Sequence, residues 1–282
     1  SFDITLRHAI LSALHRITTP AQALSWSKHA SPEVRLLGVI VLRKMEHPRI
    51  SDFLNDSDTL VKHEAIRALY DTNAVDEPAG AHLLKVKYQG LPIFIQARLL
   101  VGAARRGTTE GFTRVLEMAT DSSLDTRVQT LAFHALEQWD QYPSMDPFLG
   151  SLRPSPHPRE KSRVLADKHS THFLNYLKQE GRTEFLTLAT EVSAVLGIAL
   201  NIDDLQNQVL NRGLSSKLRV AFFNRLLQAD DGITDGLLLQ LLEDPDSKLC
   251  ALALGEAYTR NLDGVAALAE KTVRLLDVPE LA

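Results

Sequence analysis

The chain has 282 residues, of which 44% are hydrophobic, 23% charged and only 6% aromatic, and its formal net charge is −4. This composition supports a packed core and argues against extensive disorder, while the scarcity of aromatic residues disfavours a strand-rich barrel or sandwich. The whole negative excess lies in residues 141–282, which carry 15 Lys and Arg against 19 Asp and Glu. Since DNA-binding surfaces are basic, nucleic acid is not favoured as a partner.

The start of the chain, its apolar runs and its cysteine content limit the kinds of protein that the sequence can encode. The chain begins SFDITLRHAI without an initiator methionine, so we expect a piece of a longer protein. Its longest relevant uncharged apolar run, VSAVLGIALNI at 192–202, is shorter than the roughly 18 residues of a membrane-spanning helix, and no membrane insertion is expected. Cys250 is the single cysteine, which excludes a disulfide within the chain and a thiolate metal cage.

One apolar pattern recurs along the chain. In DTLVKHEAIRALYD, Val61 is followed by Ala65, Ile66 and Leu69 at offsets of four, five and eight. These offsets place the side chains on one face of a helix, so each copy predicts an amphipathic helix. We call the first apolar residue of each copy its anchor. The anchors in chain order are Leu6, Val34, Val61, Ile95, Val128, Leu218 and Leu249.

Helix-capping residues precede these anchors at a constant distance. The residues three positions before the anchors are Asp3, Ser31, Asp58, Pro92, Asp125, Ser215 and Asp246. Asp and Ser side chains accept hydrogen bonds from the free amides at a helix start. We therefore expect seven helices to begin at these positions.

Second helices are expected between the anchors, at 77–86, 109–120 and 234–244. Two helices in each period of about 30 residues are typical of helical-hairpin repeats. The interval from Val128 to Leu218 has room for two degenerate units between about Asp140 and Gly213. We predict an all-α fold, a right-handed α-solenoid of about eight to nine hairpins.

A proline-rich segment interrupts the pattern. DQYPSMDPFLGSLRPSPHPRE (140–160) contains five of the 12 Pro residues, which cannot continue a helix interior. We expect residues 141–160 to form an extended strap between two repeat regions, 1–140 and 161–282, of one continuous solenoid. Helices are expected to resume at 163–179 and 183–200.

Three phrases resemble the HEAT-repeat family, an armadillo-like helical-repeat class, in its short bacterial form. They are SPEVRLLGVIVLRKM (31–45), DTLVKHEAIRALYD (58–71) and DPDSKLCALALGEA (244–257). More narrowly, LPIFIQARLLVGAARRGT, then DTRVQTLAFHALEQW, then the strap resemble the HEAT segment of large planctomycete-type proteins. Those proteins join a sugar-dehydrogenase-like propeller, HEAT repeats and a c-type haem domain.

The resemblance implies a protein-binding solenoid and, in its narrower form, a periplasmic or extracytoplasmic location. Haem attachment would need Cys-x-x-Cys-His, whereas Cys250 is followed by Ala-Leu-Ala. We therefore expect no cofactor in this chain, and the implied dehydrogenase activity would lie outside it.

Candidate sites have competing interpretations. His63 and Glu64 could form an acid–base pair, but we expect a solvated helix surface because acid–base catalysis needs a shielded group. Basic residues follow several anchors: Arg7, Arg35, Lys62 and Arg219. They could form a strip for an acidic partner. We favour a ladder in which they meet the capping carboxylates of neighbouring units, as exposed pairs that tune stacking.

The segment after the strap carries two further hypotheses. His169 and His172 lie three apart beside Asp167, which could hold a metal, but zinc needs more ligands and surface histidines are the expectation. Residues 151–182 hold seven Lys and Arg against three Asp and Glu. Their aromatic residues, Phe173 and Tyr176, have helical spacing and are expected in the core rather than as base-stacking platforms.

No catalytic motif for a nucleophile, phosphate or dinucleotide occurs in the sequence. Trp139 either closes a gap between helices or forms part of a partner pocket. We predict a non-catalytic, monomeric scaffold for a protein partner or sibling domains. The partner-binding candidates are Arg35, Lys62, Arg67, Trp139 and Arg219. The alternative is a nucleic-acid-binding or base-excising HEAT-like enzyme, which would need a basic cleft with a buried Trp and an Asp at its floor.

Overall fold

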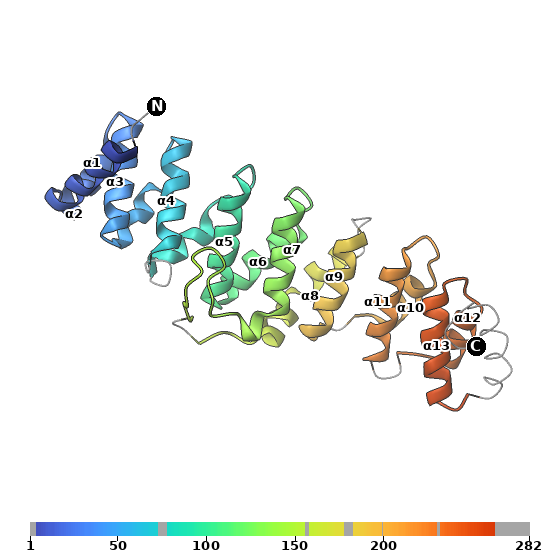
Figure 1. Cartoon of the computed structure of the whole chain (residues 1–282). Coiled ribbons are helices and arrows are strands. Elements are labelled where there is room, and N and C mark those ends of the chain that lie inside the picture. The colour runs from blue at the N-terminus through green and yellow to red at the C-terminus, as the bar shows by residue number, and fades with distance from the viewer. Residues whose placement is uncertain are drawn as a thin grey trace. The chain divides into compact units, whose positions relative to one another are not determined.

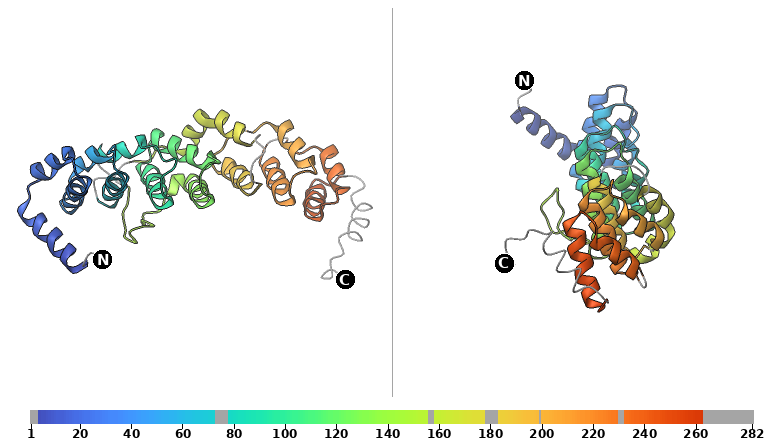
Figure 2. Two further views of the ribbon diagram at one scale, coloured as in Figure 1. Left: turned by 90° about the horizontal axis from the view of Figure 1, so that it is seen from above. Right: turned by 90° about the vertical axis from the view of Figure 1, so that its right-hand side faces the viewer.

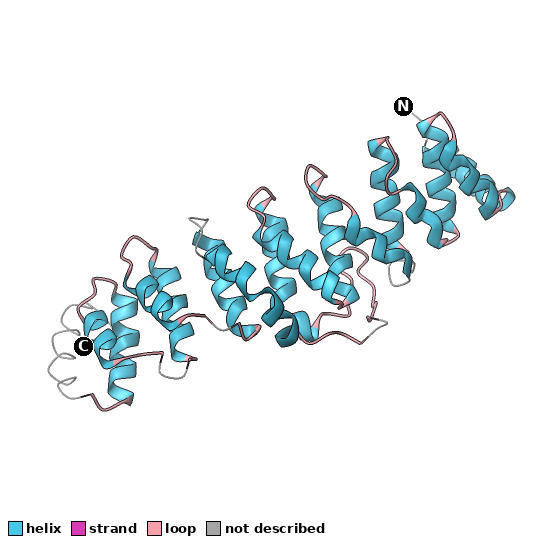
Figure 3. Ribbon diagram, turned by 180° about the vertical axis from the view of Figure 1, so that it is seen from behind, coloured by secondary structure: helices cyan, strands magenta, loops and turns pink. Residues whose placement is uncertain are grey.

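The computed structural model describes residues 4–72, 78–155, 158–177, 183–198, 200–229 and 232–262. All named elements in these ranges are helices (Figure 3), so the expected all-α fold is confirmed there. The only pairing of strand type within them is one isolated antiparallel bridge, between Met145 and Leu152. The chain divides into two compact units, residues 1–165 and 166–282.

The first unit is a succession of paired helices. The second helices of the pairs, α3, α4, α5 and α7, pack side by side in that order, and the first elements, α2, η2, η4 and α6, each pack against the helix that follows (Figure 1). The elements are α1 (Ile4–Ile17), α2 (Pro20–Ser25), η1 (Trp26–Lys28), α3 (Pro32–Lys44), η2 (Pro48–Phe53), α4 (Thr59–Asp71), η4 (Pro78–Lys85), α5 (Ile93–Arg106), α6 (Thr109–Thr120), α7 (Thr126–Glu137) and η5 (Trp139–Gln141).

The second unit repeats this pairing. Helix α10 packs against α11 and α12 against α13, while α11 also contacts α9 and α13. Helix α8 begins in the first unit and continues into the second. The elements are α8 (Ser162–Leu177), α9 (Thr183–Val195), α10 (Ile202–Leu210), α11 (Ser216–Leu227), α12 (Asp235–Leu242) and α13 (Ser247–Thr259).

The predicted helix starts are confirmed wherever the structure describes them. The N-caps of α3, α4, α5, α7, α11 and α13 are Ser31, Asp58, Pro92, Asp125, Ser215 and Asp246. The side chain accepts a backbone hydrogen bond in every case except Pro92. Asp3 lies outside the described residues. Five anchors are at most 1% exposed, namely Val61, Ile95, Val128, Leu218 and Leu249.

Three features of the helices differ from expectation: the type of one helix, the end of another, and the number of helices between about 140 and 213. The segment expected as a helix over 77–86 is the 3-10 helix η4. Helix α9 ends at Val195 rather than near Leu200, because Gly197 adopts φ 69° and the amide of Ile198 bonds back to the carbonyl of Ser193 at 2.9 Å. That geometry is a glycine-based helix stop. Between about 140 and 213 the described residues hold the strap and three helices, α8, α9 and α10, rather than the four helices of two units, and α10 pairs with α11.

A side chain directly after the anchor binds the carboxyl end of the preceding helix or the loop after it. Gln96 donates to the carbonyl of Tyr88 at 3.1 Å and Gln129 to that of Ala119 at 3.2 Å. The same contact joins Arg35 to His29 and Ala30, Arg219 to Val209, and Cys250 to Leu242. Terminal carbonyls of a helix have no partner inside it, so this position joins the two helices of a pair.

The arginines at this position also join successive pairs. Arg35 binds Asp56 through two hydrogen bonds of 2.8 and 2.9 Å, and Arg219 binds Asp244 through two of 3.0 and 2.8 Å. The expected ladder is therefore corrected in two respects. The main acid stands two residues before the cap of the next pair, because the capping carboxylates bind their own helix amides. The Arg219–Asp244 pair is also buried rather than exposed.

The carboxylate of Asp244 depends on this arginine. Burial alone would raise the pKa of Asp244, but hydrogen bonds from Arg219 and from the amide of Asp246 outweigh burial and hold the pKa below its ordinary value. The carboxylate is therefore ionised in the folded chain and needs its cation.

The strap folds back onto the first unit (Figure 2, left view, yellow-green loop). The guanidinium of Arg153 donates to the carbonyls of Tyr70 and Thr72 at the carboxyl end of α4. It also lies 3.5 Å from the carboxylate of Asp146, which accepts the hydroxyl of Tyr70 at 2.8 Å. These groups are almost fully buried. The strap thus supplies donors to a helix end.

Further along the strap, Glu160 makes one contact with the loop between α5 and α6 and two with the first residue of α6. Its amide donates to the carbonyl of Gly107 at 2.9 Å. Its carboxylate accepts the amide and hydroxyl of Thr109 at 3.1 and 2.6 Å. The unit boundary follows the strap, within α8.

Replacing Arg219 should destabilise the second unit strongly. Arg219→Met leaves the carboxylate of Asp244 buried without its main cation, so we expect a loss of about 3–5 kcal/mol in the free energy of unfolding. Urea unfolding followed by circular dichroism measures this loss. The matched control is Arg212→Met, because Arg212 contacts the same carboxylate at 3.3 Å but its side chain is 65% exposed. That change should lower the free energy of unfolding by less than about 1 kcal/mol. Equal losses in the two variants would contradict the assignment of Arg219 as the main cation of Asp244.

Replacing Arg153 should release the strap. Arg153→Met removes the donors for Tyr70 and Thr72, so chymotrypsin cleavage at Phe148 and Leu149 should accelerate about tenfold, because cleavage follows the population of the open form. Limited proteolysis with mass spectrometry measures the rate of cleavage at these two residues. Arg127→Met is the control, since Arg127 is exposed and pairs with the cap of its own helix. An unchanged cleavage rate in Arg153→Met would show that the strap is held by other contacts.

Candidate functional site

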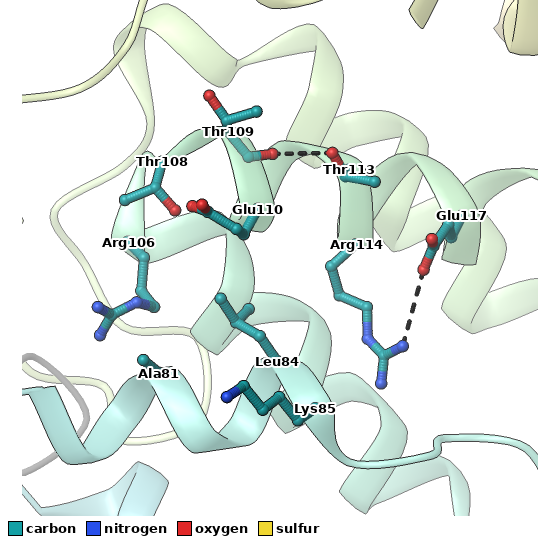
Figure 4. Close-up of a pocket in the computed structure, with 10 residues that line it drawn as sticks. All are labelled: Ala81, Leu84, Lys85, Arg106, Thr108, Thr109, Glu110, Thr113, Arg114 and Glu117. Carbon is teal, nitrogen blue, oxygen red and sulfur yellow. Dashed lines mark hydrogen bonds and ion pairs between the residues drawn. The ribbon is translucent and has the colours of Figure 1, made fainter.

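A groove of about 590 Å³ lies between η4 and α6 in the first unit. It is lined by the ten residues labelled in Figure 4, which come from η4, the end of α5, the loop between α5 and α6, and one face of α6. Gly107, with φ 64°, ends α5, and Thr108 caps α6 through the amide of Gly111 at 3.2 Å. A Cβ on Gly111 would lie 2.4 Å from the carbonyl oxygen of Ala103, so glycine lets the two helices approach.

The walls of the groove are mainly polar. Lys85, Arg106 and Arg114 contribute three positive charges, and Glu110 and Glu117 two negative ones. Three threonines at the start of α6 add hydroxyl groups, while Ala81 and Leu84 of η4 form an apolar strip. The groove can therefore contact both charged and apolar groups of a ligand.

Arg114 is the most enclosed cation of the groove. Its guanidinium lies 4.3 Å from the ring centre of Tyr88, donates to the carbonyl of Val86 and is 3.7 Å from the carboxylate of Glu117. Burial lowers the pKa of Arg114, an effect that Glu117 and Tyr88 oppose. A further carboxylate beside Arg114 would gain from this weak hydration.

Lys85 is exposed and makes no ion pair or hydrogen bond within the part of the chain that the structure describes. The first amide and hydroxyl of α6, those of Thr109, are already bound by Glu160. The hydroxyl of Thr113 donates to the carbonyl of Thr109 at 2.9 Å (Figure 4). Lys85 is therefore the groove's most accessible charge, and the amino end of α6 is already capped.

The chemistry of the groove favours binding. Its carboxylates, Glu110 and Glu117, are both exposed, whereas a catalytic acid or base needs a shielded position that tunes its pKa. Among the described residues no group of three or more His, Cys, Asp or Glu is arranged to hold a metal ion.

The phrase around His63 forms part of an ion-pair network. Glu64, expected on a solvated surface, pairs with Arg43 at 3.0 Å and with Arg67 at 3.6 Å. Burial, and to a lesser extent the charge of Lys62, lower the pKa of His63. The expected solvated helix surface is thus corrected in part, because Glu64 is bound to arginines of α3 and α4.

Asp71 is the centre of this network. Its carboxylate, 6% exposed, pairs with Arg43 of α3 at 2.7 Å, Arg67 of α4 at 3.4 Å and Arg98 of α5 at 3.2 Å. Arg98 also lies 4.9 Å from the ring centre of Phe148 in the strap. The network therefore joins three successive helices to the strap.

The predicted partner-binding residues lie on different elements of the two units, and among them only Lys62 and Arg67 share a helix, α4. Arg35 is bound to Asp56, Lys62 is half-buried on α4, and Arg67 is 46% exposed. Arg219 is buried in the second unit. Arg67 is thus the most exposed of the candidates, and Arg219 is used inside the fold.

Trp139 is also used inside the fold. It is fully buried and packs edge-on against Phe112 with ring centres 5.0 Å apart. Its indole N–H donates to the carbonyl of Glu160 at 2.9 Å, and the guanidinium of Arg159 lies 4.7 Å from its ring centre. Of the two interpretations, the geometry matches a residue that closes the space between α6 and the strap.

The metal and nucleic-acid hypotheses concern α8. The side chains of Asp167 and His172 lie outside the described residues, while His169 is half-buried. Phe173 and Tyr176 are buried, which confirms them as core residues. Arg7, which follows the first anchor, also has its side chain outside the described part.

Sequence reasoning missed the groove. Its three cations come from the consecutive elements η4, α5 and α6 but are widely spaced in the sequence, at positions 85, 106 and 114, so no short motif marks them. Arg106, at the end of α5, and Arg114, in the middle of α6, are only eight residues apart, and that clustering was the available indication.

Two comparisons with known proteins bear on identity. The sequence matches no family model and no curated protein. In the described residues, no helix combines the length and the apolar character needed to cross a bilayer.

Proposed function

We propose that the chain is a non-catalytic scaffold, a HEAT-like right-handed α-solenoid of about eight to nine helix pairs that binds a protein partner or sibling domains. The observation that supports it is the repeated contact after the anchor. The same position binds the carboxyl end of the preceding helix or the loop after it in α3, α5, α7, α11 and α13. One repeated unit with one joining contact is the physical basis of a repeat array.

Repeat arrays bind through extended surfaces. Each pair buries one side against its neighbours, which leaves successive helices to present a continuous face to a partner. In the first unit, α3, α4, α5 and α7 follow one another in such a row (Figure 1). Exposed side chains on this row, such as Arg67 of α4, and those of the groove between η4 and α6 would determine specificity.

The narrower resemblance gives the partner its context. If this chain is the HEAT segment of a larger periplasmic or extracytoplasmic protein, its partners are sibling domains, a dehydrogenase-like propeller and a c-type haem domain. The chain then holds these domains at a fixed separation and needs no cofactor of its own.

The solenoid predicts an elongated monomer. A compact chain of 282 residues has a radius of gyration of about 19 Å. Helix pairs stacked about 10 Å apart would form a row of roughly 80 Å, with a radius of gyration of at least about 24 Å. Small-angle X-ray scattering, which gives both the radius of gyration and the mass, distinguishes the compact chain from the elongated monomer. A value near that of a compact chain, or a dimer, would contradict the proposal.

The scaffold function predicts binding without turnover. A photo-crosslinking amino acid at position 67, introduced into the full-length gene product in its own cells, should trap a protein or sibling domain. The trapped species, once purified, should bind the chain with an affinity that Arg67→Ala reduces and that Arg49→Ala, an exposed arginine on η2, leaves unchanged. Catalytic turnover by the isolated chain, stoichiometric metal binding, or binding of no protein in this assay would contradict the function.

A further inference from the structure

We propose that the groove between η4 and α6 is the recognition site for an extended acidic segment of the partner, an inference that rests on the proposed scaffold function. The groove is defined by the ten residues labelled in Figure 4 and is distinct from the surface around Arg67. The partner segment would be a stretch of chain that carries several Asp or Glu side chains with an apolar side chain among them.

The arrangement of charge selects an extended ligand. Lys85 belongs to η4, Arg106 to the end of α5 and Arg114 to the middle of α6, and Figure 4 shows the three cations spread along the groove. A small anion such as phosphate is best bound where donors converge on one point. Cations distributed over three elements instead match acidic side chains that follow one another along a peptide.

The remaining lining fits the same ligand. A volume of about 590 Å³ exceeds what one carboxylate needs, and the strip of Ala81 and Leu84 offers an apolar contact between the charges. The amino end of α6 contributes nothing, because Glu160 already binds Thr109. Recognition therefore depends on the side chains of the walls.

The acidic residues of the groove set limits on the position of the ligand. Glu117 neutralises part of the charge of Arg114 at 3.7 Å, and the exposed Glu110 repels an acidic side chain placed next to it. Lys85 has no ion-pair partner in the described part of the chain. An acidic side chain beside Lys85 consequently gains attraction without displacing an existing pair, so Lys85 is the residue to test.

The test uses fluorescence anisotropy with the full chain and two fluorescein-labelled short peptides. The first contains Glu, Leu and Gly, and in the second every Glu is replaced by Gln. The variants are Lys85→Glu and the control Lys87→Glu, which makes the same charge change at an exposed lysine that does not line the groove. Both changes are at the surface, and circular dichroism checks the fold.

We expect the Glu peptide to bind more tightly than the Gln peptide. Lys85→Glu should weaken its binding at least about fivefold, and Lys87→Glu less than about twofold, as expected for one exposed charge pair. Equal weakening by both variants, equal binding of both peptides, or displacement of the Glu peptide by an equal charge of inorganic phosphate would overturn the inference.

Binding measurements with the native partner test this inference separately from the scaffold function. If the protein trapped at position 67 binds Lys85→Glu as tightly as the unaltered chain, the groove is not its recognition site and the scaffold function stands. If Lys85→Glu weakens that binding and Lys87→Glu does not, the groove is the recognition site for that partner.

Discussion

The satisfaction of helix-terminal carbonyls is the constraint on which this structure depends. Every helix ends with carbonyls that have no partner inside it, and a chain of many short helices has many such ends. Here the residue after the anchor supplies the donor at several of these ends, as Gln129 does through its amide at the end of α6 and Arg219 through its guanidinium at the end of α10. Arg219 adds an acid of the next pair to the same contact. One side chain therefore joins both the helices of a pair and successive pairs.

The strap applies the same chemistry without a helix. At the carboxyl end of α4, Arg153 donates to the carbonyls of Tyr70 and Thr72, and near the end of α5, Ser155 donates to that of Arg105 at 3.0 Å. The prolines of the strap lack a backbone N–H, and its arginine and serine side chains provide the donors to these helix ends. These contacts explain how an irregular segment is held against helix ends, while Glu160 of the strap binds Thr109 at the start of α6, beside the groove.

Local patterns predicted the helices well and the contacts between them less well. Capping residues such as Asp58 and Ser215 located helix starts because a cap acts within one turn. The partner of Arg219 could not be deduced in this way, since Asp244 and Asp246 are both acids and only the fold shows which faces the guanidinium. The end of α9 was placed too late because an apolar run continues past Gly197. The groove brings together Lys85 and Arg114, whose proximity depends on packing between η4 and α6.

The burial of Trp139 has a practical consequence for studying the two units. The only other tryptophan, Trp26, also belongs to the first unit, so intrinsic indole emission reports on that unit alone. Amide absorption reports on both units. A melting curve recorded with the two signals would therefore coincide if the units unfold together and separate if one melts before the other, which gives a label-free measure of cooperativity along the chain.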